Sequence, residues 1–487
     1  MKFCSITIRI KSFSFLFLLL FFSLLIHAQP LIQSATFSPY SRFGIGTMEP
    51  SGYAAISAMG GSYTAYQNDT LIPLFINSGN PASYSTNRLT TMEFGMHGSN
   101  TNFISDSGNI KRKTAGFKYL SLAFPIRRNM GGAFGLQPFS SVGYNSTTYT
   151  SVDSVGQVKN SYQGTGGINQ VFLGFAIRPF DKSWSKFYSK RYKELREKGY
   201  HRTIKRNRFF RRALSTLSLG TNVSFLFGTL DYYSYAYFPY SYGTVFNTEQ
   251  HTETVVHDIY YQGGAQMSFD IDSIGHYNLK NNLKIILGYS ISMPKNLDAI
   301  SSQVAYNFSS QSNNVIQPFD TFYYRTSTKG SIYIPLMQSV GLGFKSGDKV
   351  TVLFDGGYQQ WSKFLGFNAD NQHMRDLYKA SVGIQYLPRR GATGDWSYLK
   401  KINYRIGARY NTGNVVLNNK TLGDYAFSAG VGLPAGGGRF RLFAMANLSG
   451  EWGVMGTSQN NLVQEKYFKF TIGLTFNDRW FIKSKYD

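Results

Sequence analysis

The sequence of 487 residues contains a single cysteine, Cys4, which lies within the first few positions. Cys4 precedes a long apolar run, so it cannot be the acylated cysteine that follows a lipoprotein signal sequence. Removal of an N-terminal leader would leave a mature chain without any thiol. Structural disulfides, thiolate metal sites and cysteine nucleophiles are therefore excluded together.

Charged residues are also scarce, at 16% of the chain, and mean hydropathy is only −0.23. A soluble domain usually carries about 25% charged residues. In their place the chain has 40 phenylalanines, 35 tyrosines and 49 glycines. This composition suits strands that face lipid on one side and a polar interior on the other, although composition alone does not exclude a large secreted β-sandwich or propeller.

Long hydrophobic runs are absent except for one near the beginning of the chain. Phe13 to Ile26 is apolar apart from two serines, follows a basic stretch, and leads to a small residue, Ala28. The run is short for a transmembrane helix, which needs about 20 apolar residues. Residues 1–28 are therefore predicted to be a cleaved signal peptide, and the exported chain is expected to have no helical membrane span.

Motifs for catalysis and metal binding are missing as well. The sequence has no G-x-S-x-G elbow and no pair of histidines with H-x-x-x-H spacing. His251 and His257 lie near Glu249, Glu253 and Asp258, a group that would bind either a cation or nothing, and the second is favoured. We therefore expect neither an enzyme nor a protein that binds a metal or another cofactor.

The clearest positive signal is alternation with a period of two residues, which indicates β-strands. In the last segment Phe470 and Ile472 share one face, whereas Lys469 shares the other with small polar residues. Segments 217–227 and 171–177 repeat the pattern. Such an apolar face packs on a core in a soluble sheet and faces lipid in a membrane barrel, so alternation alone leaves both possibilities open.

The number of these segments favours a barrel, because single-chain bacterial barrels have an even number of strands. We therefore predict an all-β fold, a transmembrane antiparallel β-barrel of about 14 strands over residues 90–487. The strands are expected near residues 90–101, 114–126, 131–147, 167–179, 214–230, 252–270, 283–293, 329–346, 348–364, 376–389, 403–418, 421–435, 439–453 and 466–481.

The connections between the segments alternate in length, as they do in outer-membrane barrels. Arg127-Arg128-Asn129, Ser346-Gly347-Asp348 and Gly436-Gly437-Gly438 predict short turns. Long polar loops are predicted at the other end of the barrel, over residues 148–166, 231–251 and 294–328.

Residues 29–89 differ from the rest of the chain, because small and turn-forming residues replace the alternation. Phe43, Ile45 and Phe75 nevertheless argue for packing. Irregular backbone is tolerated inside a barrel lumen, where water or wall side chains satisfy its polar groups. We predict that this segment is an N-terminal hatch or plug inside the lumen; the alternative is a flexible tail.

Several short motifs in this region and at the end of the chain carry a family resemblance. Ala58-Met59-Gly60-Gly61 precedes Asn80-Pro81-Ala82 and the predicted strands. In this order, over nearly the whole mature chain, the sequence resembles the FadL/TodX family of outer-membrane transporters. The stretch from Ser38 to Gly44 and the ending Asp478-Arg479-Trp480-Phe481-Ile482-Lys483 resemble its Bacteroidota branch.

The resemblance implies a fourteen-strand barrel closed by an N-terminal hatch that carries the Asn-Pro-Ala motif, here Asn80, Pro81 and Ala82. It also implies passive uptake of a hydrophobic small molecule, such as a long-chain fatty acid or an aromatic hydrocarbon. The chain departs from the family in a large insertion after the fourth strand. Relatives in the Bacteroidota include proteins that serve secretion, so the substrate is left open.

A hydrophobic solute can leave the lumen sideways only through a gap in the ladder of interstrand hydrogen bonds. Proline lacks an N–H, and glycine eases a bend. Gly135 and Pro138 lie in the third predicted strand, where the resemblance implies a kink that opens the wall, and they form a candidate lateral gate. The alternative is that Pro138 marks an ordinary bulge at the barrel rim, since Pro335 and Pro434 also lie in strands.

The insertion at 180–213 is strongly basic, with fourteen Lys/Arg against three Asp/Glu between Arg178 and Arg212. Its aromatic residues recur at helical spacing. With the N-terminus in the periplasm, the connection after the fourth strand is also expected in the periplasm. Such a helix could lie on membrane headgroups, dock a periplasmic protein partner, or be merely solvated; nucleic acid is not expected because the chain is exported. The residues that would form the binding face are Trp184, Lys186, Phe187, Tyr188, Lys190, Arg191 and Tyr192.

The leading hypothesis is passive transport of a hydrophobic compound across the outer membrane through a hatch-gated barrel surrounded by outer-membrane lipids. The alternative is a structural or secretion-associated barrel that docks a periplasmic partner. An apolar pocket in the lumen would favour the first. Co-purification of periplasmic proteins that depends on residues 178–212 would favour the second.

Overall fold

The computed structural model describes most of the chain after residue 35, which forms one compact unit. The predicted signal peptide and most of the basic insertion lie outside the described residues. These are 36–50, 52–68, 75–106, 108–153, 155–180, 213–239, 246–271, 283–310, 316–347, 349–388, 398–435 and 443–478.

The described residues form a closed antiparallel β-barrel of fourteen strands, as the sequence predicts. Two of the fourteen are interrupted near a proline, at Pro294 and at Pro335, and each therefore consists of two consecutive elements. The wall contains β2 (Thr90–Ser105), β3 (Gly108–Arg127), β4 (Met130–Val152), β5 (Gly156–Ile177), β6 (Ser218–Tyr237), β7 (Asn247–Ile271), β8 with β9 (Leu283–Ser292 and Lys295–Ser310), β10 with β11 (Ile316–Ile334 and Met337–Ser346), β12 (Val350–Gln359), β13 (Leu377–Tyr386), β14 (Asn403–Asn411), β17 (Asp424–Ala435), β18 (Phe443–Met455) and β19 (Gln464–Asp478).

The ring closes because the last strand pairs with the first. β19 and β2 are joined along their whole length, from Gln464 opposite Ile104 to Asp478 opposite Thr90. Short 3-10 helices lie in the connections at η4 (Trp361–Lys363), η5 (Phe367–Ala369) and η6 (Leu399–Lys401), and β15 (Val416–Leu417) pairs with β16 (Lys420–Thr421). No helix among the described residues is both long and apolar enough to cross a membrane.

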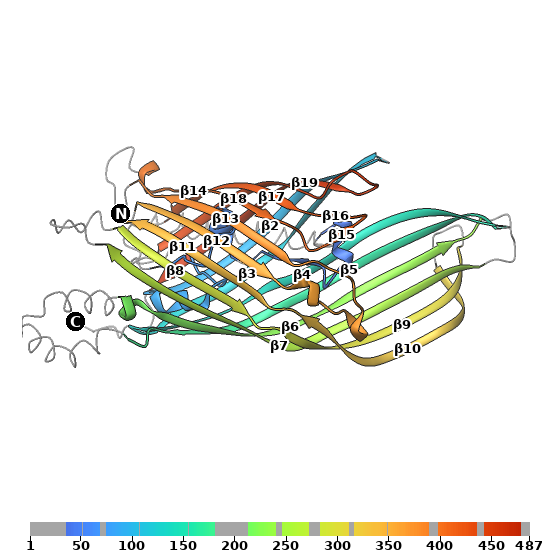
Figure 1. The fold of residues 1–487 in the computed structure, drawn as a ribbon, viewed down its shortest axis with the longest axis horizontal. Helices are drawn as coiled ribbons and strands as arrows, with labels where there is room; N and C mark the ends of the chain where they lie inside the picture. The colour runs from blue at the N-terminus through green and yellow to red at the C-terminus, as the bar shows by residue number, and fades with distance from the viewer. Residues whose placement is uncertain are drawn as a thin grey trace, which may run out of the picture. The chain divides into compact units, whose positions relative to one another are not determined.

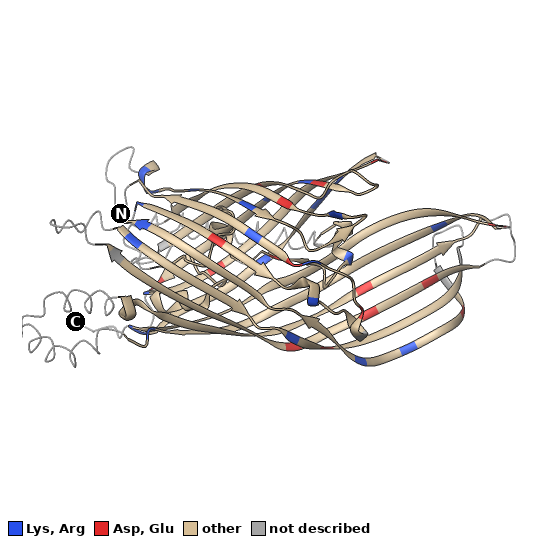
Figure 2. Ribbon diagram, in the orientation of Figure 1, with Lys and Arg blue, Asp and Glu red and all other residues tan. Residues whose placement is uncertain are grey.

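The apolar faces of the strands point out of the barrel. In β19, Phe470 and Ile472 are exposed, whereas Thr471 and Thr475 are buried on the inner side. Leu219 and Phe225 are likewise exposed on β6. Charged residues are sparse along the strands (Figure 2). A soluble sheet would bury this face, so the outward apolar stripe identifies a wall that contacts lipid.

The prediction of long loops at one end of the barrel was wrong. Most of residues 148–166, 231–251 and 294–328 belong to strands, because β4 to β7, β9 and β10 continue well past the other strands as long hairpins (Figure 1). The end of β4, residues 145–152, is exposed on both faces. A strand that meets water on both sides needs no apolar stripe, so the period-two signal disappears there although the strand does not.

The described residues of the N-terminal segment, 36–50, 52–68 and 75–89, lie inside the ring. They contain η1 (Pro39–Arg42), β1 (Thr47–Met48), α2 (Ala54–Ser57) and η2 (Pro81–Thr86). η2 contacts β3 to β7, whereas α2 contacts β17 to β19, on another side of the wall. Since one short segment touches strands around the ring, it occupies the lumen.

Candidate functional site in the barrel lumen

The Asn-Pro-Ala motif begins η2 and attaches it to the wall. The Asn80 side chain accepts a hydrogen bond from the Ala82 N–H (3.2 Å) and donates to the Thr64 carbonyl (2.7 Å). Pro81 occupies the first turn, where its missing N–H costs nothing. The Ser218 hydroxyl of β6 donates to the Ala82 carbonyl. The motif is therefore a cap that fixes the turn of the chain and its distance from β6.

Glycines in the wall make this close approach possible. A Cβ on Gly220 would lie 2.5 Å from the Ala82 nitrogen, and one on Gly264 would lie 2.1 Å from Asn80 Oδ1. Neither atom could be accommodated without moving η2. Inward-facing glycines meet the N-terminal segment in the same way at positions 131, 288, 383, 407 and 430. The many glycines of the sequence thus form a smooth inner surface on which the segment packs.

Two carboxylates of the wall hold the backbone of the N-terminal segment. Asp355 on β12 accepts hydrogen bonds from the N–H groups of Tyr63 (2.7 Å) and Thr64 (2.8 Å). Glu93 on β2 accepts one from the Ile76 N–H (2.8 Å) and one from the Thr475 hydroxyl (2.7 Å). Both carboxylates accept hydrogen bonds from backbone N–H groups that would otherwise be buried in the barrel interior without a partner.

A cavity of about 400 Å³ lies between the N-terminal segment and the wall. On the apolar side it is lined by Phe37, Phe43, Met48, Phe139 and Trp361. Among the wall residues that reach it are some from the early part of β3 and of β19, the middle of β4 and the late part of β12, β14 and β18. The cavity therefore lies toward the end of the barrel with the long hairpins, and the segment from α2 to η2 separates it from the end with the short turns.

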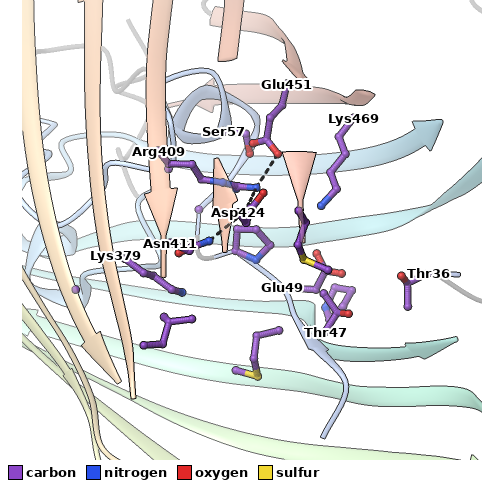
Figure 3. A pocket seen from close by; sticks show the side chains of 18 of the residues that line it. Thr36, Thr47, Glu49, Ser57, Lys379, Arg409, Asn411, Asp424, Glu451 and Lys469 are labelled. Carbon is purple, nitrogen blue, oxygen red and sulfur yellow. Dashed lines mark hydrogen bonds and ion pairs between the residues drawn. The ribbon is translucent and has the colours of Figure 1, made fainter. Parts of the chain in front are cut away.

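An ion cluster forms one side of the cavity (Figure 3). The Arg409 guanidinium contacts Asp424 (3.2 Å) and Glu451 (2.9 Å), and it donates to the Tyr467 hydroxyl (2.9 Å). The Tyr467 hydroxyl donates in turn to Asp424 (2.6 Å). The one guanidinium faces two carboxylates, so the cluster braces β14, β17, β18 and β19 from inside and carries a formal net charge of −1.

Three lysines also line the cavity, and they are not compensated in this way. Lys379 and Lys469 carry their ammonium groups toward its middle (Figure 3). Among the described residues neither has a carboxylate within ion-pair distance. The Lys118 ammonium donates only to the hydroxyls of Ser57 (3.3 Å) and Thr471 (3.4 Å). The cavity thus combines an apolar side with three lysines that have no ion-pair partner within the described part of the chain, although the carboxylates of Glu49 and Glu465 also line it.

Gly135 and Pro138 lie where β3 and β4 separate. The two strands are paired from Arg127 opposite Met130 to Leu120 opposite Leu136, and the ladder between these described residues goes no further. A Cβ on Gly135 would lie 2.7 Å from the Leu120 carbonyl oxygen, so this glycine allows the last close approach. Beyond it β4 and β5 run apart from β2 and β3 (Figure 1).

Pro138 also marks a bulge, which was the alternative reading of the sequence. The register between β4 and β5 shifts between Pro138 and Ser140, so that Phe139 has no partner on β5. Gln137, Pro138 and Phe139 line the cavity. The bulge and the separation of β3 from β4 therefore occur at the same place, beside the cavity.

The other candidate residues do not join this site. Trp184, Lys186, Phe187, Tyr188, Lys190, Arg191 and Tyr192 lie outside the described residues. His251 contacts Asp231 (3.1 Å) and stacks on Tyr233 in the hairpin of β6 and β7. Within the part of the chain that the structure describes, no group of three His, Cys, Asp or Glu residues could hold a metal ion.

Sequence reasoning missed Lys118, Lys379 and Arg409 as lumen residues. The signal was present but weak for Lys379 and Arg409, which lie on the polar side of an alternating strand. A charge at such a position points into the lumen, which is the rule that placed Lys469 on the inner face of β19. Lys118 has the same parity as the exposed Leu120, and it lies at a bulge where the register between β2 and β3 shifts, so alternation could not place it. Alternation does not show which inward-facing charges on different strands lie at the same level of the barrel and therefore close together.

The chain was compared with known families and structures. A family model described as BamG matches residues 10–184 and 210–487. The interval between the two ranges covers most of the basic insertion. No curated protein is significantly similar in sequence.

Two similar solved structures are outer-membrane channels. The toluene transporter TodX of Pseudomonas putida has a TM-score of 0.53 at 14% identity, and the match covers 89% of this chain and all of that one. A FadL homologue of Pseudomonas aeruginosa has a TM-score of 0.50 at 10% identity, covering 89% of this chain and 98% of that one. At this identity the likeness concerns the fold. Together with the outward apolar wall, it locates the chain in an outer membrane.

Proposed function

The chain belongs to the BamG family of outer-membrane barrels, and from its lumen we propose that it admits a hydrophobic compound with an acidic group. The compound enters the cavity from the end with the long hairpins, which is the outer side if the short turns face the periplasm. It then leaves sideways through the gap between β3 and β4. The N-terminal segment gates this path and closes the periplasmic end.

The observation that carries the proposal is the position of the cavity. It lies beside the place where the β3–β4 ladder ends, and Pro138 and Phe139 belong both to its lining and to that edge. A solute with an apolar body would gain by passing from the cavity into lipid without crossing water. A protein of the same fold, the toluene transporter TodX, also carries a hydrophobic compound, which supports the proposal of transport.

The lysines narrow the class of substrate. A neutral hydrocarbon would leave Lys118, Lys379 and Lys469 in an apolar contact that costs free energy. A carboxylate or phosphate would instead receive charge-assisted hydrogen bonds from them. The cavity therefore fits an anionic amphiphile, such as a fatty acid, better than toluene.

Binding of dodecanoate and of neutral dodecanol to the purified protein tests this choice. Replacing Lys379→Met together with Lys469→Met should weaken dodecanoate binding at least about tenfold, since a hydrogen bond to a charged group contributes about 1.5–3 kcal/mol. Dodecanol binding should change little. Lys349→Met, on an exposed turn outside the cavity, is the matched control. Equal loss for both ligands, or no binding of either to the native protein, would reject the proposal.

The alternative, a structural or secretion-associated barrel that docks a periplasmic partner, retains one supporting observation. The segment from α2 to η2 is fixed to the wall by buried contacts, among them those of Asn80, Glu93 and Asp355. A barrel that never opens would also show such anchoring. Native protein that binds no amphiphile but retains periplasmic proteins during purification would favour this second function.

A further inference from the structure

β4 has two edges, and its second edge changes partner along the strand. One edge pairs with β5 from Met130 to Val152. The other edge pairs with β3 only as far as Leu136. Further along the same edge, Ser140 and Ser141 pair with β1 of the N-terminal segment. β1 therefore stands in the position that β3 would occupy if the wall continued unbroken.

The bonds between the N-terminal segment and this edge extend beyond the two paired residues. The Glu49 N–H donates to the Phe139 carbonyl (3.0 Å). The Gly143 N–H donates to the Ser41 hydroxyl (3.0 Å), which also lies 3.2 Å from the Gly143 carbonyl. The edge from Phe139 to Gly143 thus has its backbone groups satisfied by residues 41–49 and not by a neighbouring wall strand.

The same stretch of chain also holds the opposite side of the gap. The Ser38 hydroxyl donates to Glu465 on β19. The Tyr40 hydroxyl exchanges hydrogen bonds with the Val463 carbonyl (2.7 Å) and N–H (2.8 Å). The Arg112 guanidinium of β3 lies 5.8 Å from the centre of the Phe37 ring. Residues 36–49, which we call the strap, therefore span from the β19–β3 side of the barrel to β4.

We propose that the strap is a removable wall strand, which seals the gap between β3 and β4 and leaves β4 when a solute passes. This inference rests on the proposed function and assigns its gate to residues 36–49, apart from the Asn-Pro-Ala motif. The strap is suited to leave. Its end at β4, formed by Thr47, Met48 and Glu49, is only partly buried, although Ser41 and Ile45 earlier in the strap are buried; residues 53–56 and 80–86 are buried throughout. Elements with fewer buried contacts open first.

A disulfide between strap and wall tests the proposal. Thr47 and Ser141 are paired directly across the two strands, a geometry that accepts a disulfide, and Cys4 is the only native cysteine. Thr47→Cys with Ser141→Cys should block transport when the protein is oxidised. Dodecanoate uptake into vesicles should then be at least about tenfold slower with the oxidised protein than with the reduced protein. Added reductant should restore uptake.

The matched control fixes η2 in place of the strap. The hydroxyls of Ser85 and Ser218 lie 2.7 Å apart, and both residues are buried. Ser85→Cys with Ser218→Cys should leave oxidised and reduced uptake within about twofold of each other. Unchanged uptake in the strap variant would overturn the proposal. Equal loss in both variants would overturn it too, because the whole segment would then have to move.

Hydrogen exchange separates this inference from the proposed function. If the reduced variants take up no dodecanoate, the transport proposal fails on its own. The strap is then judged in the native protein in lipid bilayers. The Glu49 amide, bonded to Phe139, should exchange at least about tenfold faster than the Tyr63 and Thr64 amides bonded to Asp355. Equal exchange at these amides would overturn the removable strand.

Discussion

At the scale of single residues, the inner wall is shaped by glycines, which have no side chain to keep the N-terminal segment away. Gly220 and Gly264 leave room for Asn80-Pro81-Ala82, so the motif and the two glycines form one contact although they are more than 130 residues apart in sequence. Any side chain there would displace the cap and, with it, the hydrogen bond from Asn80 to Thr64.

Substituting Gly264→Ala should therefore destabilise the barrel. The added Cβ would overlap Asn80 Oδ1, and overpacking of this kind costs about 1–3 kcal/mol. The free energy of unfolding, measured by urea titration in lipid vesicles, reports the cost. Gly116→Ala on β3 is the control, because the nearest atom to its Cβ would be His97 Cε1 at 3.8 Å. Equal stability of the two variants would contradict the packing role of Gly264.

Tyr40 predicts how the strap responds to alkali. Burial raises the pKa of its hydroxyl to about 12, helped by the nearby Glu465 and opposed by the hydrogen bond with Val463. The folded state therefore holds this proton more tightly than the unfolded state, whose pKa is about 10. The contribution of Tyr40 to stability is complete below pH 10 and is lost as the pH rises toward 12.

Thermal unfolding of the native protein and of Tyr40→Phe between pH 9 and pH 12 measures this contribution. The native protein should be the more stable at pH 9, and the difference between the two should shrink as the pH rises. Other tyrosines titrate in the same range in both proteins, so only the difference is informative. A difference that stays constant across this range would show that the Tyr40 hydroxyl is not held in its neutral form by the fold.

At the scale of elements, the sequence predicts the strands where they cross lipid and fails where they leave it. Inside the membrane each strand must show apolar side chains outward, and the alternation around Phe470 or Phe225 is therefore unmistakable. Residues 148–152 and 318–328 meet water, lose that constraint and were predicted as loops. The polar N-terminal segment could be placed in the lumen, but its path could not be foreseen.

The strap shows why the candidate site was only partly predictable. Its attachment depends on backbone groups of Phe139 and Gly143, which any residue type provides. No pattern in the sequence marks such a bond. Pro138 did carry a signal, since a proline within a strand predicts a local break in the ladder. Sequence thus indicates where the wall is interrupted, and only the structure shows what fills the interruption.

Replacing Pro138→Val should lower dodecanoate uptake without preventing assembly. Valine brings an N–H that can extend the ladder of β4. A net gain of about 1 kcal/mol from one hydrogen bond would reduce an opening equilibrium roughly fivefold. Uptake into vesicles measures the effect, and the mobility of unheated protein on a gel reports whether the barrel has formed.

Pro434→Val provides the comparison for that substitution. Pro434 also lies within a strand, β17, but it is paired with Met445 in an uninterrupted ladder with β18. This variant should transport at the native rate. Native uptake by Pro138→Val, or an equal decrease in both variants, would count against a gate at Pro138.

At the scale of the whole molecule, the family model separates a barrel that it matches from the basic insertion, most of which it does not match. The first matched range ends at 184 and the second begins at 210, so most of the basic insertion lies outside what the family model matches. We hypothesise that the insertion serves a periplasmic contact. The charges it carries, thirteen Lys/Arg against three Asp/Glu over residues 181–212, would suit an acidic protein surface or anionic headgroups.

Deleting residues 181–212 should leave barrel formation and dodecanoate uptake within about twofold of native, because the described barrel and cavity do not include them. Periplasmic proteins that co-purify with the native chain should be lost from the deleted one, which quantitative mass spectrometry can measure. If the same proteins are recovered with both chains, the insertion is a solvated excursion and the docking hypothesis is rejected.

The seam between β19 and β2 has a consequence for how the protein is assembled. Because β19 pairs with β2, the ring stays open until these two strands, which come from opposite ends of the described barrel, have met. The residues that fill the ring are made first, ahead of β2. They must be seated against the curling sheet before the two ends meet, since the contacts of Asn80 and Asp355 lie on strands from different parts of the circumference. The pairing of β2 with β19 is thus the step that encloses the N-terminal segment.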